Sequence, residues 1–250
     1  MKLSILIPVY NEVQTLPLVV DRLLTMDLGM DVELVVSDDG STDGTADLVA
    51  GLADRPQIKV VLGETNRGKG AALRAGLPQV TGELVLIQDA DLEYDPDDIP
   101  QLLAPILAGR ADVVLGSRFV GGESHRVLYF WHSLANRWLT FLSNMLSDLN
   151  LTDMEVGYKV FRQPLLTSID LHEDRFGFEP EVVARLTRVR VDGKRVRFYE
   201  VGISYNGRTY EEGKKIGWKD GAWALWCILR YNLAAPRVKI EALAPLDDKA

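Results

Sequence analysis

The 250-residue chain has little cysteine and little histidine: one cysteine, Cys227, and three histidines. A single cysteine excludes an internal disulfide and any cysteine-rich metal site, and it fits a reducing compartment. The histidines lie far apart in the sequence, so they do not indicate a metal site either. We therefore expect no metal site built on cysteine or histidine.

Long apolar runs are also missing. The longest stretch without a charged residue covers residues 99–109 and contains two prolines, whereas a membrane-spanning helix needs about twenty apolar residues. The first residues run directly into a strand-like segment, with no cleavable signal pattern. We therefore expect that the chain does not cross a membrane by itself.

Positive charge is in deficit, with 28 Lys and Arg against 36 Asp and Glu and a net charge of -8. This balance argues against nucleic acid as a partner. Hydrophobic residues make up 47% and charged residues 26% of the chain, close to the globular average, which excludes disordered and coiled-coil classes. A chain of this length forms one large α/β domain or two small ones.

The first half alternates between short apolar segments rich in β-branched residues and segments with a helical spacing of apolar residues. The pattern predicts strands over residues 2–9, 32–37, 58–62, 84–88 and 113–116. It predicts helices over residues 15–26, 45–53, 71–78 and 99–107. Near-continuous apolar strands between helices imply parallel pairing with both faces covered. The expected fold class is α/β, with a doubly wound, mostly parallel central sheet.

The pattern changes after residue 118, but no linker or repeat separates two domains. Helices are predicted over residues 128–146, 181–188 and 216–229, and a strand over 197–201. We expect a single domain over residues 1–232 with two halves, 1–118 and 119–232. Residues 233–250 are expected to form a C-terminal tail whose last dozen residues fray.

Four polar clusters follow predicted strands, at residues 8–12, 38–43, 66–70 and 89–93. Ligands of open α/β sheets bind outside the carboxyl ends of the strands, so four clusters at one edge predict a site. The last cluster holds Asp89, Asp91 and Glu93, which are alternating carboxylates at the end of a core strand. Such oxygen ligands suit Mg²⁺ or Mn²⁺, with the remaining ligands coming from water and a substrate's phosphates. We favour this metal site over a solvated acidic turn.

Residues 66–70, Asn-Arg-Gly-Lys-Gly, place backbone N–H groups and two cations at a helix N-terminus. This arrangement indicates an anion site, a helix-capping turn, or both. Neither a Gly-x-Gly-x-x-Gly fingerprint nor a Walker-type loop is present, which argues against a dehydrogenase or a P-loop enzyme.

Taken together, the motifs resemble a known family. They are residues 7–12 (Ile-Pro-Val-Tyr-Asn-Glu), 38–44 (Asp-Asp-Gly-Ser-Thr-Asp-Gly), 66–70, 89–91 (Asp-Ala-Asp), 116–118, 153–159 and 205–210. In this order and spacing they resemble family-2 inverting glycosyltransferases with the GT-A fold, and within that family polyprenyl-phosphate (dolichyl-phosphate) sugar synthases. The resemblance covers about residues 1–232. It implies a nucleotide-sugar-binding half, 1–118, and an acceptor-binding half, 119–232.

The resemblance also implies roles for single residues. Those that it places at the nucleotide sugar are Pro8, Tyr10, Glu12, Asp39, Lys69, Asp89 and Ala90. It implies that Asp89 and Asp91 hold the metal, with Glu93 at a position that supplies a further ligand. It places Arg118 and Arg208 at the pyrophosphate and the acceptor phosphate, and it implies that these arginines and Asp91 are catalytic.

The chemistry of sugar transfer agrees with these roles. A divalent cation with Arg and Lys neutralises a departing pyrophosphate, and cations also hold an incoming phosphate, which needs no general base, in line with the anomeric carbon. Arg118 and the second half supply cations, of which we assign Arg118, Arg137 and Arg208 to the acceptor; the others are Arg126, Lys214 and Lys215. A hydroxyl acceptor would instead require a base, Asp153 or Glu155, although either could equally cap a helix or pair with Lys159.

We therefore expect a metal-dependent hexosyltransferase that passes a hexose from a nucleotide sugar, of the GDP-mannose or UDP-glucose type, to a polyprenyl phosphate with inversion. One alternative is the same fold acting on a hydroxyl of a polysaccharide or glycolipid. Another is a phosphotransferase with Asp89 as nucleophile, which is disfavoured because such motifs normally open the first strand. A third is a catalytically silent membrane adaptor, against which the intact acids and arginines argue.

Aromatic residues gather in residues 128–146 and 218–231, mixed with Arg and Lys as in interfacial helices. Most of these rings are expected to pack in the core. The others, with Lys214, Lys215 and Lys219 nearby, are expected to give weak peripheral membrane contact, unless a membrane partner protein brings the chain to its lipid. The expected location is cytoplasmic, at the cytoplasmic face of a membrane.

Overall fold

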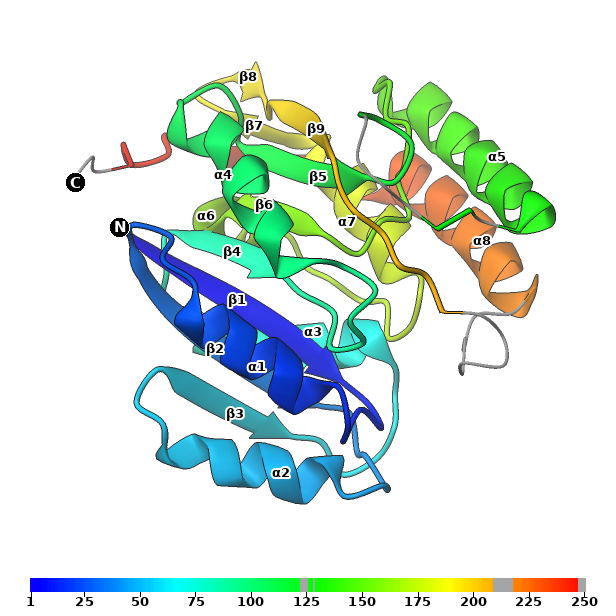
Figure 1. The fold of residues 1–250 in the computed structure, drawn as a ribbon. Helices are drawn as coiled ribbons and strands as arrows, with labels where there is room; N and C mark the ends of the chain where they lie inside the picture. The colour runs from blue at the N-terminus through cyan, green and yellow to red at the C-terminus, as the bar shows by residue number, and fades with distance from the viewer. Residues whose placement is uncertain (122–125, 128, 209–217, 247–250) are drawn as a thin grey trace.

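The computed structural model describes residues 1–121, 126–127, 129–208 and 218–246. Its centre is a seven-stranded sheet in the order β3-β2-β1-β4-β6-β5-β9 (Figure 1). These strands are β1 (Lys2–Val9), β2 (Asp31–Asp38), β3 (Ile58–Leu62), β4 (Leu84–Ile87), β5 (Val113–Ser117), β6 (Lys159–Arg162) and β9 (Phe198–Gly202). Neighbouring strands pair in parallel except β6, which is antiparallel to β4 and β5. The predicted α/β class with a mostly parallel sheet is confirmed.

Helices cover both faces of this sheet. They are α1 (Leu16–Thr25), α2 (Thr45–Gly51), α3 (Lys69–Gly76), α4 (Ile99–Leu107), α5 (Phe130–Ser147), α6 (Gln163–Thr167), α7 (Phe178–Leu186) and α8 (Trp218–Ala234). In the view of Figure 1, α1 and α4 lie in front of the sheet and α3 and α7 lie behind it. Helices α5 and α8 contact each other at one end of the molecule.

The central strands are buried because their sequences are almost continuous apolar runs. All residues of β4 and of β5 are buried. Strand β1 pairs with β2 up to Val9–Asp38 and with β4 up to Leu6–Ile87. This register brings the polar segments that follow Val9, Asp38 and Ile87 to one edge of the sheet, as their positions after parallel strands predict.

Strand β6 was not predicted. It has only four residues and begins with Lys159, whose exposed fraction is 1%. A lysine that follows a polar stretch is not expected in a buried strand. The sequence of residues 159–162 therefore did not predict one. Its antiparallel insertion between β4 and β5 places residues 153–158 beside the carboxyl end of β4.

A second, three-stranded sheet has the order β10-β7-β8. Its strands are β7 (Val189–Val191), β8 (Lys194–Arg195) and β10 (Val238–Ile240). Strand β10 lies in the segment expected to be a tail and pairs in parallel with β7. The expected fraying is therefore wrong for Lys239 and Ile240, because the apolar side chains of Val238 and Ile240 pack against the core. None of the helices in the described ranges is long and apolar enough to span a bilayer.

Candidate active site

A cavity of about 1060 Å³ lies at the edge of the sheet where β1, β4 and β5 end. The predicted site residues that line it are Pro8, Tyr10, Glu12, Asp39, Lys69, Asp89, Ala90, Asp91, Glu93, Arg118 and Arg208. Arg137 differs from expectation because it is not among the lining residues. It lies exposed on α5, with its guanidinium 5.8 Å from the centre of the Phe119 ring.

Asp89 and Asp91 lie in the turn that follows β4. Asp91 Oδ1 accepts a hydrogen bond from the backbone N–H of Glu93 at 3.1 Å. Burial, and then the charges of Asp89 and Glu93, raise the pKa of Asp91 to about 7 although Arg208 acts in the opposite direction. Burial and the two neighbouring carboxylates together disfavour the charged form of Asp91.

The role of Glu93 as a further metal ligand stays a prediction, and in this structure its carboxylate is hydrogen-bonded to Tyr205 and Arg208. Its Oε2 accepts a hydrogen bond from the Tyr205 hydroxyl at 2.7 Å, and its Oε1 accepts one from the backbone N–H of Arg208 at 3.0 Å. Within the part of the chain that the structure describes, no group of three or more Asp, Glu, His or Cys side chains could hold a metal ion. Glu93 thus holds residues 205–208 next to the turn that contains Asp89 and Asp91, which we call the acidic turn.

Arg208 links three carboxylates from two distant parts of the chain. Its Nη2 lies 3.0 Å from Glu12 Oε1 and 3.1 Å from Asp91 Oδ2, and its Nε lies 3.4 Å from Glu93 Oε1. Burial by itself would lower the pKa of Arg208, but Asp91 and Glu12 outweigh it and raise the pKa. The guanidinium is therefore a permanent positive charge beside the acidic turn.

Lys69 provides a second cation at this edge. Its Nζ lies 2.8 Å from Asp89 Oδ1 and 3.1 Å from Glu179 Oε1. These two carboxylates outweigh the effect of burial and raise the pKa of Lys69. Sequence reasoning assigned no role to Glu179, because a glutamate in the first turn of a helix carries no signal of a site.

The loop before α3 is fixed by Asp39. The Asp39 carboxylate accepts hydrogen bonds from the backbone N–H groups of Arg67 at 3.1 Å and Gly68 at 2.6 Å. Gly68 has φ +117°, and a Cβ there would lie 2.5 Å from the Asp174 carbonyl oxygen, so only glycine fits. Two of the N–H groups that suggested an anion site thus bind Asp39, and the loop acts as a helix-start turn.

Arg118 also lines the cavity and is held by a buried ion pair with Asp153. Nε and Nη2 donate to the two Asp153 carboxylate oxygens at 2.6 and 2.7 Å, and Asn136 donates to the same carboxylate at 2.9 Å. Burial opposes ionisation of Asp153, but Arg118 and these hydrogen bonds lower its pKa. A carboxylate bound in this way is a poor proton acceptor, and the contacts of Asp153 orient Arg118.

Glu155 is in the opposite state. Its Oε1 is buried and has no hydrogen-bond partner. Burial, and then the charge of Glu179, raise the pKa of Glu155 to about 8, although Lys159 acts against them. Of the two base candidates from the sequence, only Glu155 has the pKa and the position on the cavity wall that proton transfer would require.

The residues at the acidic turn fit a divalent cation. Asp89 and Asp91 are hard oxygen donors on the cavity wall, and a bound cation would favour the ionised form of Asp91, whose pKa is raised by burial and by the neighbouring carboxylates. Two protein carboxylates with phosphate oxygens as the remaining ligands are usual for Mg²⁺.

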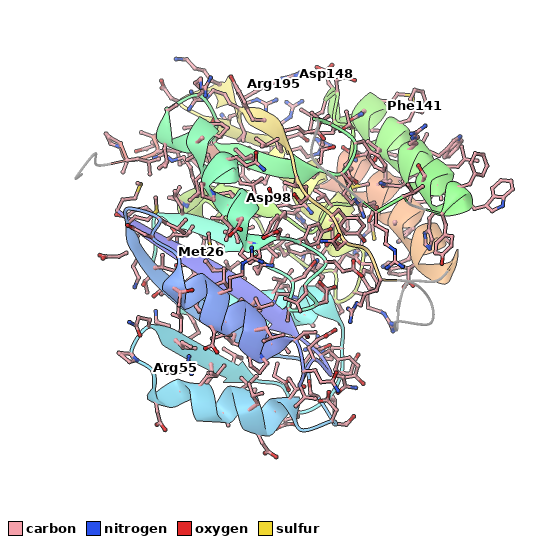
Figure 2. All side chains as sticks on the ribbon, in the orientation of Figure 1. Met26, Arg55, Asp98, Phe141, Asp148 and Arg195 are labelled. Carbon is pink, nitrogen blue, oxygen red and sulfur yellow. The ribbon has the colours of Figure 1, made fainter. Side chains whose placement is uncertain are left out.

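The aromatic side chains of α5 differ from the expected core packing. Its outward face is apolar and exposed, with Phe130, Trp131, Leu134, Trp138, Phe141 and Met145 between 44% and 76% accessible. Figure 2 labels Phe141 at the periphery of the molecule. On α8, Trp226 is 53% exposed, while the indole N–H of Trp223 donates to Glu173 at 2.6 Å. Lys214, Lys215, the Lys219 side chain, and Thr209 and Tyr210 of the last motif lie outside the description that the structure gives.

Comparison with known families identifies the origin of these motifs. The family described as Glycosyl transferase family 2 matches residues 4–169. An undecaprenyl-phosphate mannosyltransferase of Micrococcus luteus is 33% identical over 249 residues, covering 94% of this chain and 96% of the relative. The dolichol-phosphate mannosyltransferase of Pyrococcus furiosus is 26% identical, covering 87% of this chain and 60% of the longer relative. The predicted resemblance to polyprenyl-phosphate sugar synthases is confirmed.

Solved structures agree with the fold. A glucosyl-3-phosphoglycerate synthase from Mycobacterium tuberculosis, in complex with Mn²⁺, uridine diphosphate and phosphoglyceric acid, superposes with a TM-score of 0.65 at 22% identity. The match covers 92% of this chain and 78% of that one. At this identity the likeness shows a shared GT-A fold and no more.

Proposed function

The chain belongs to glycosyl transferase family 2, and from this premise we propose that it transfers a hexose from a nucleotide sugar to a polyprenyl phosphate with inversion. One observation carries the proposal. A single cavity joins the acidic turn after β4 to three cationic side chains, Lys69, Arg118 and Arg208, and reaches α5 with its exposed rings. The relatives named for undecaprenyl phosphate and dolichol phosphate support this type of acceptor.

The donor is a nucleotide sugar of the GDP-mannose or UDP-glucose type. Pro8 and Tyr10, at the end of β1, border the nucleoside, with Ala90 on the same wall. Asp39 keeps the loop before α3 in place, and Lys69 faces the pyrophosphate. Asp89 and Asp91 would hold Mg²⁺ or Mn²⁺, which neutralises the charge of the departing nucleoside diphosphate. The complex of the M. tuberculosis synthase with Mn²⁺ and uridine diphosphate is consistent with this choice.

The acceptor phosphate is held by arginine. Arg118, oriented by Asp153, and Arg208, beside Asp91, lie on the cavity wall. A phosphate oxygen attacks the anomeric carbon on the face opposite the nucleoside diphosphate, whose bond to that carbon breaks. Because the phosphate is already an anion, no residue has to remove its proton, and the arginines contribute by positioning and charge.

A second candidate is transfer to a hydroxyl acceptor. The observation that favours it is Glu155, a carboxylate on the cavity wall with an unpartnered oxygen and a pKa of about 8. A hydroxyl must lose its proton on attack, and such a group would accept it. Transfer assays that compare undecaprenyl phosphate with polysaccharide and glycolipid acceptors separate the two candidates. Transfer to the phosphate needs no base, whereas transfer to a hydroxyl needs one.

Donor binding is tested first by thermal shift. A ligand that binds only the native state raises the melting temperature by mass action. We expect one nucleotide sugar, among GDP-mannose, UDP-glucose and related donors, to raise it only with Mg²⁺ or Mn²⁺, and EDTA to abolish the shift. An equal shift in EDTA would contradict the metal site, and no shift with any donor would contradict transferase activity and favour a catalytically silent adaptor.

The lipid acceptor implies that the cavity faces a membrane, directly or through a partner protein. The apolar face of α5 suits an interfacial position, and we place the protein at the cytoplasmic face of the membrane. Co-sedimentation with anionic and neutral vesicles should show weak binding that Phe130→Ser/Phe141→Ser reduces. The matched control, Leu18→Ser/Leu62→Ser, removes apolar side chains elsewhere that are also more than half exposed, and it should have no effect. Wild-type failure to bind either vesicle at low salt would favour a partner protein.

A further inference from the structure

Arg175 differs from the other lysines and arginines of the cavity wall in having no acidic partner. Its side chain is exposed and lines the cavity. Within the described ranges of the chain, this side chain forms no hydrogen bond and no ion pair. Lys69, Arg118 and Arg208 each pair with one or more carboxylates. Arg175 can therefore meet an anionic ligand without first giving up a carboxylate.

The segment that carries this arginine is fixed on two sides. On one side, Glu173 accepts hydrogen bonds from the Trp223 indole N–H and the Tyr231 hydroxyl of α8, both at 2.6 Å. On the other side, the Asp174 carbonyl oxygen accepts a hydrogen bond from the backbone N–H of Ala71 in α3 at 2.9 Å. The backbone is therefore preorganised, and only the arginine side chain loses freedom when a ligand binds.

The side chain of Arg175 lies against the loop before α3. A Cβ at Gly68 would lie 2.7 Å from Arg175 Cγ. The Gly68 N–H donates to Asp39, and the next residue, Lys69, pairs with Asp89. In the proposed function Lys69 faces the donor pyrophosphate, so Arg175 lies next to the same part of the donor.

The charge of the cavity wall shows why a further cation matters. The wall carries eight Asp and Glu residues against four Lys and Arg residues. A diphosphate that enters the cavity therefore meets more negative than positive formal charge, and one divalent cation offsets only part of the excess. A guanidinium group presents several N–H donors in a fork that matches phosphate oxygens. The chemistry of Arg175 therefore suits a phosphate group.

We propose that Arg175 binds the diphosphate of the nucleotide sugar through its guanidinium group, beside Lys69. This inference rests on the proposed function and names a further binding residue for it. The diphosphate is present both before and after its bond to the sugar breaks, so the contact acts mainly on donor affinity. Substitution of Arg175 should therefore raise the KM for the nucleotide sugar more than it lowers kcat.

Calorimetric titration of GDP and UDP, each with Mn²⁺, tests the contact in the full chain. Arg175→Gln removes the charge but keeps the Cγ atom that lies against Gly68. We expect it to weaken diphosphate binding about tenfold, and Arg175→Lys to lose less because it keeps the charge. The loss should shrink as NaCl is added. Arg110→Gln, which removes an exposed arginine outside the cavity lining, is the matched control and should bind like wild type.

Transfer assays with undecaprenyl phosphate distinguish the two sources of phosphate in this cavity. In Arg175→Gln, the KM for the nucleotide sugar should rise and the KM for undecaprenyl phosphate should stay unchanged. The opposite pattern, with unchanged affinity for GDP and UDP, would overturn the assignment to the donor. A loss of diphosphate affinity that salt does not reduce and that Arg175→Lys shares in full would make the residue structural, and it would overturn the proposal as well.

Failure of this inference and failure of the proposed function are distinguishable. If wild type and Arg175→Gln bind GDP and UDP equally, the inference fails and the proposed function stands. If wild type binds neither diphosphate with Mn²⁺, the proposed function fails together with the inference. The melting temperature of each variant without ligand should match wild type, because the Arg175 side chain has no partner to lose among the described residues. Arg175→Lys carries the test if Arg175→Gln does not fold.

Discussion

Glu33, which is buried, and Glu155, which is partly exposed but has one buried carboxylate oxygen, lie at opposite ends of the central sheet. At the amino ends of the strands, the Glu33 carboxylate accepts hydrogen bonds from Ser4 at 2.5 Å and from the Thr81 N–H at 2.7 Å, and it lies 3.1 Å from Lys59 Nζ. Burial opposes its ionisation, but Lys2, Ser4 and Thr81 lower the pKa of Glu33 to about 2. At the carboxyl ends, burial and Glu179 raise the pKa of Glu155 to about 8.

The pKa values of the two glutamates differ because ligands bind at only one end of the sheet. Ligands bind at the carboxyl ends of parallel strands, so the chain supplies its own donors at the amino ends and leaves acceptors open at the other. A fully paired buried carboxylate stabilises the fold, whereas crowded or unpartnered carboxylates are expected where a ligand completes the site. Substitutions of the two glutamates should therefore change stability with opposite signs, and only substitutions at the carboxyl ends should also change activity.

Asp91→Asn is expected to have the largest effect. It removes a proposed metal ligand, and we expect turnover to fall by about three orders of magnitude or more. The free energy of unfolding at pH 8 should not fall, because one of three mutually repelling carboxylates loses its charge. Transfer assays and urea denaturation measure both, with the exposed Asp54→Asn as the matched control. Full activity of Asp91→Asn would contradict the metal site.

Arg208→Ala is expected to reduce turnover by about two orders of magnitude, because the guanidinium neutralises developing and incoming negative charge. Glu12, Asp91 and Glu93 then lose their shared cation, so melting at neutral pH should fall modestly. Mg²⁺ or Mn²⁺ should restore melting more in the variant than in wild type. A large loss of melting temperature that metal does not restore, with unchanged activity per folded molecule, would make Arg208 a structural residue.

Much of the fold is predictable because most strands of the central sheet have a clear sequence pattern. Strands β1 to β5 are short apolar runs between helical segments, and pairing them in parallel needs no further information. Strand β6 is the exception, since Lys159 at its start is buried only because Glu155 and Glu179 lie near it in space. Strand β10 depends in the same way on β7, which lies far from it in the sequence.

The sequence predicts which polar segments reach the site, because each of these segments follows a parallel strand. Asp39, Asp89 and Asp91 reach one edge of the sheet for that reason. What their side chains contact there is not predictable, because the partners come from distant segments. Arg208 meets Glu12 across 196 positions, and Asp39 binds backbone N–H groups of the loop before α3. Glu93 carries the spacing of a metal ligand but is bound by Tyr205 and Arg208.

Glu155→Gln tests the carboxyl end by stability. The folded-state pKa of Glu155, about 8, lies above its ordinary value of 4.5. Its contribution to stability is therefore fully present below pH 4.5 and is lost as pH rises through 8. The glutamine variant does not titrate, so it should become more stable than wild type over this window, by on the order of 2–3 kcal/mol. Urea denaturation at pH 5, 7 and 8.5 measures the difference, which should be absent for the exposed Glu64→Gln.

Glu33→Gln tests the amino end and should give the opposite sign with a smaller effect. The folded-state pKa of Glu33, about 2, lies below 4.5, so its contribution is present above pH 4.5 and is lost as pH falls through 2. At pH 7 the variant should be less stable than wild type by about 1–2 kcal/mol, because Lys2 and Lys59 lose their partner while an amide still serves Ser4 and Thr81. The difference should shrink steadily between pH 4.5 and 2.5 in urea denaturation, and donor binding at pH 7 should match wild type. A stability difference that does not depend on pH would mean that packing, and not charge, distinguishes Glu33 from Glu155.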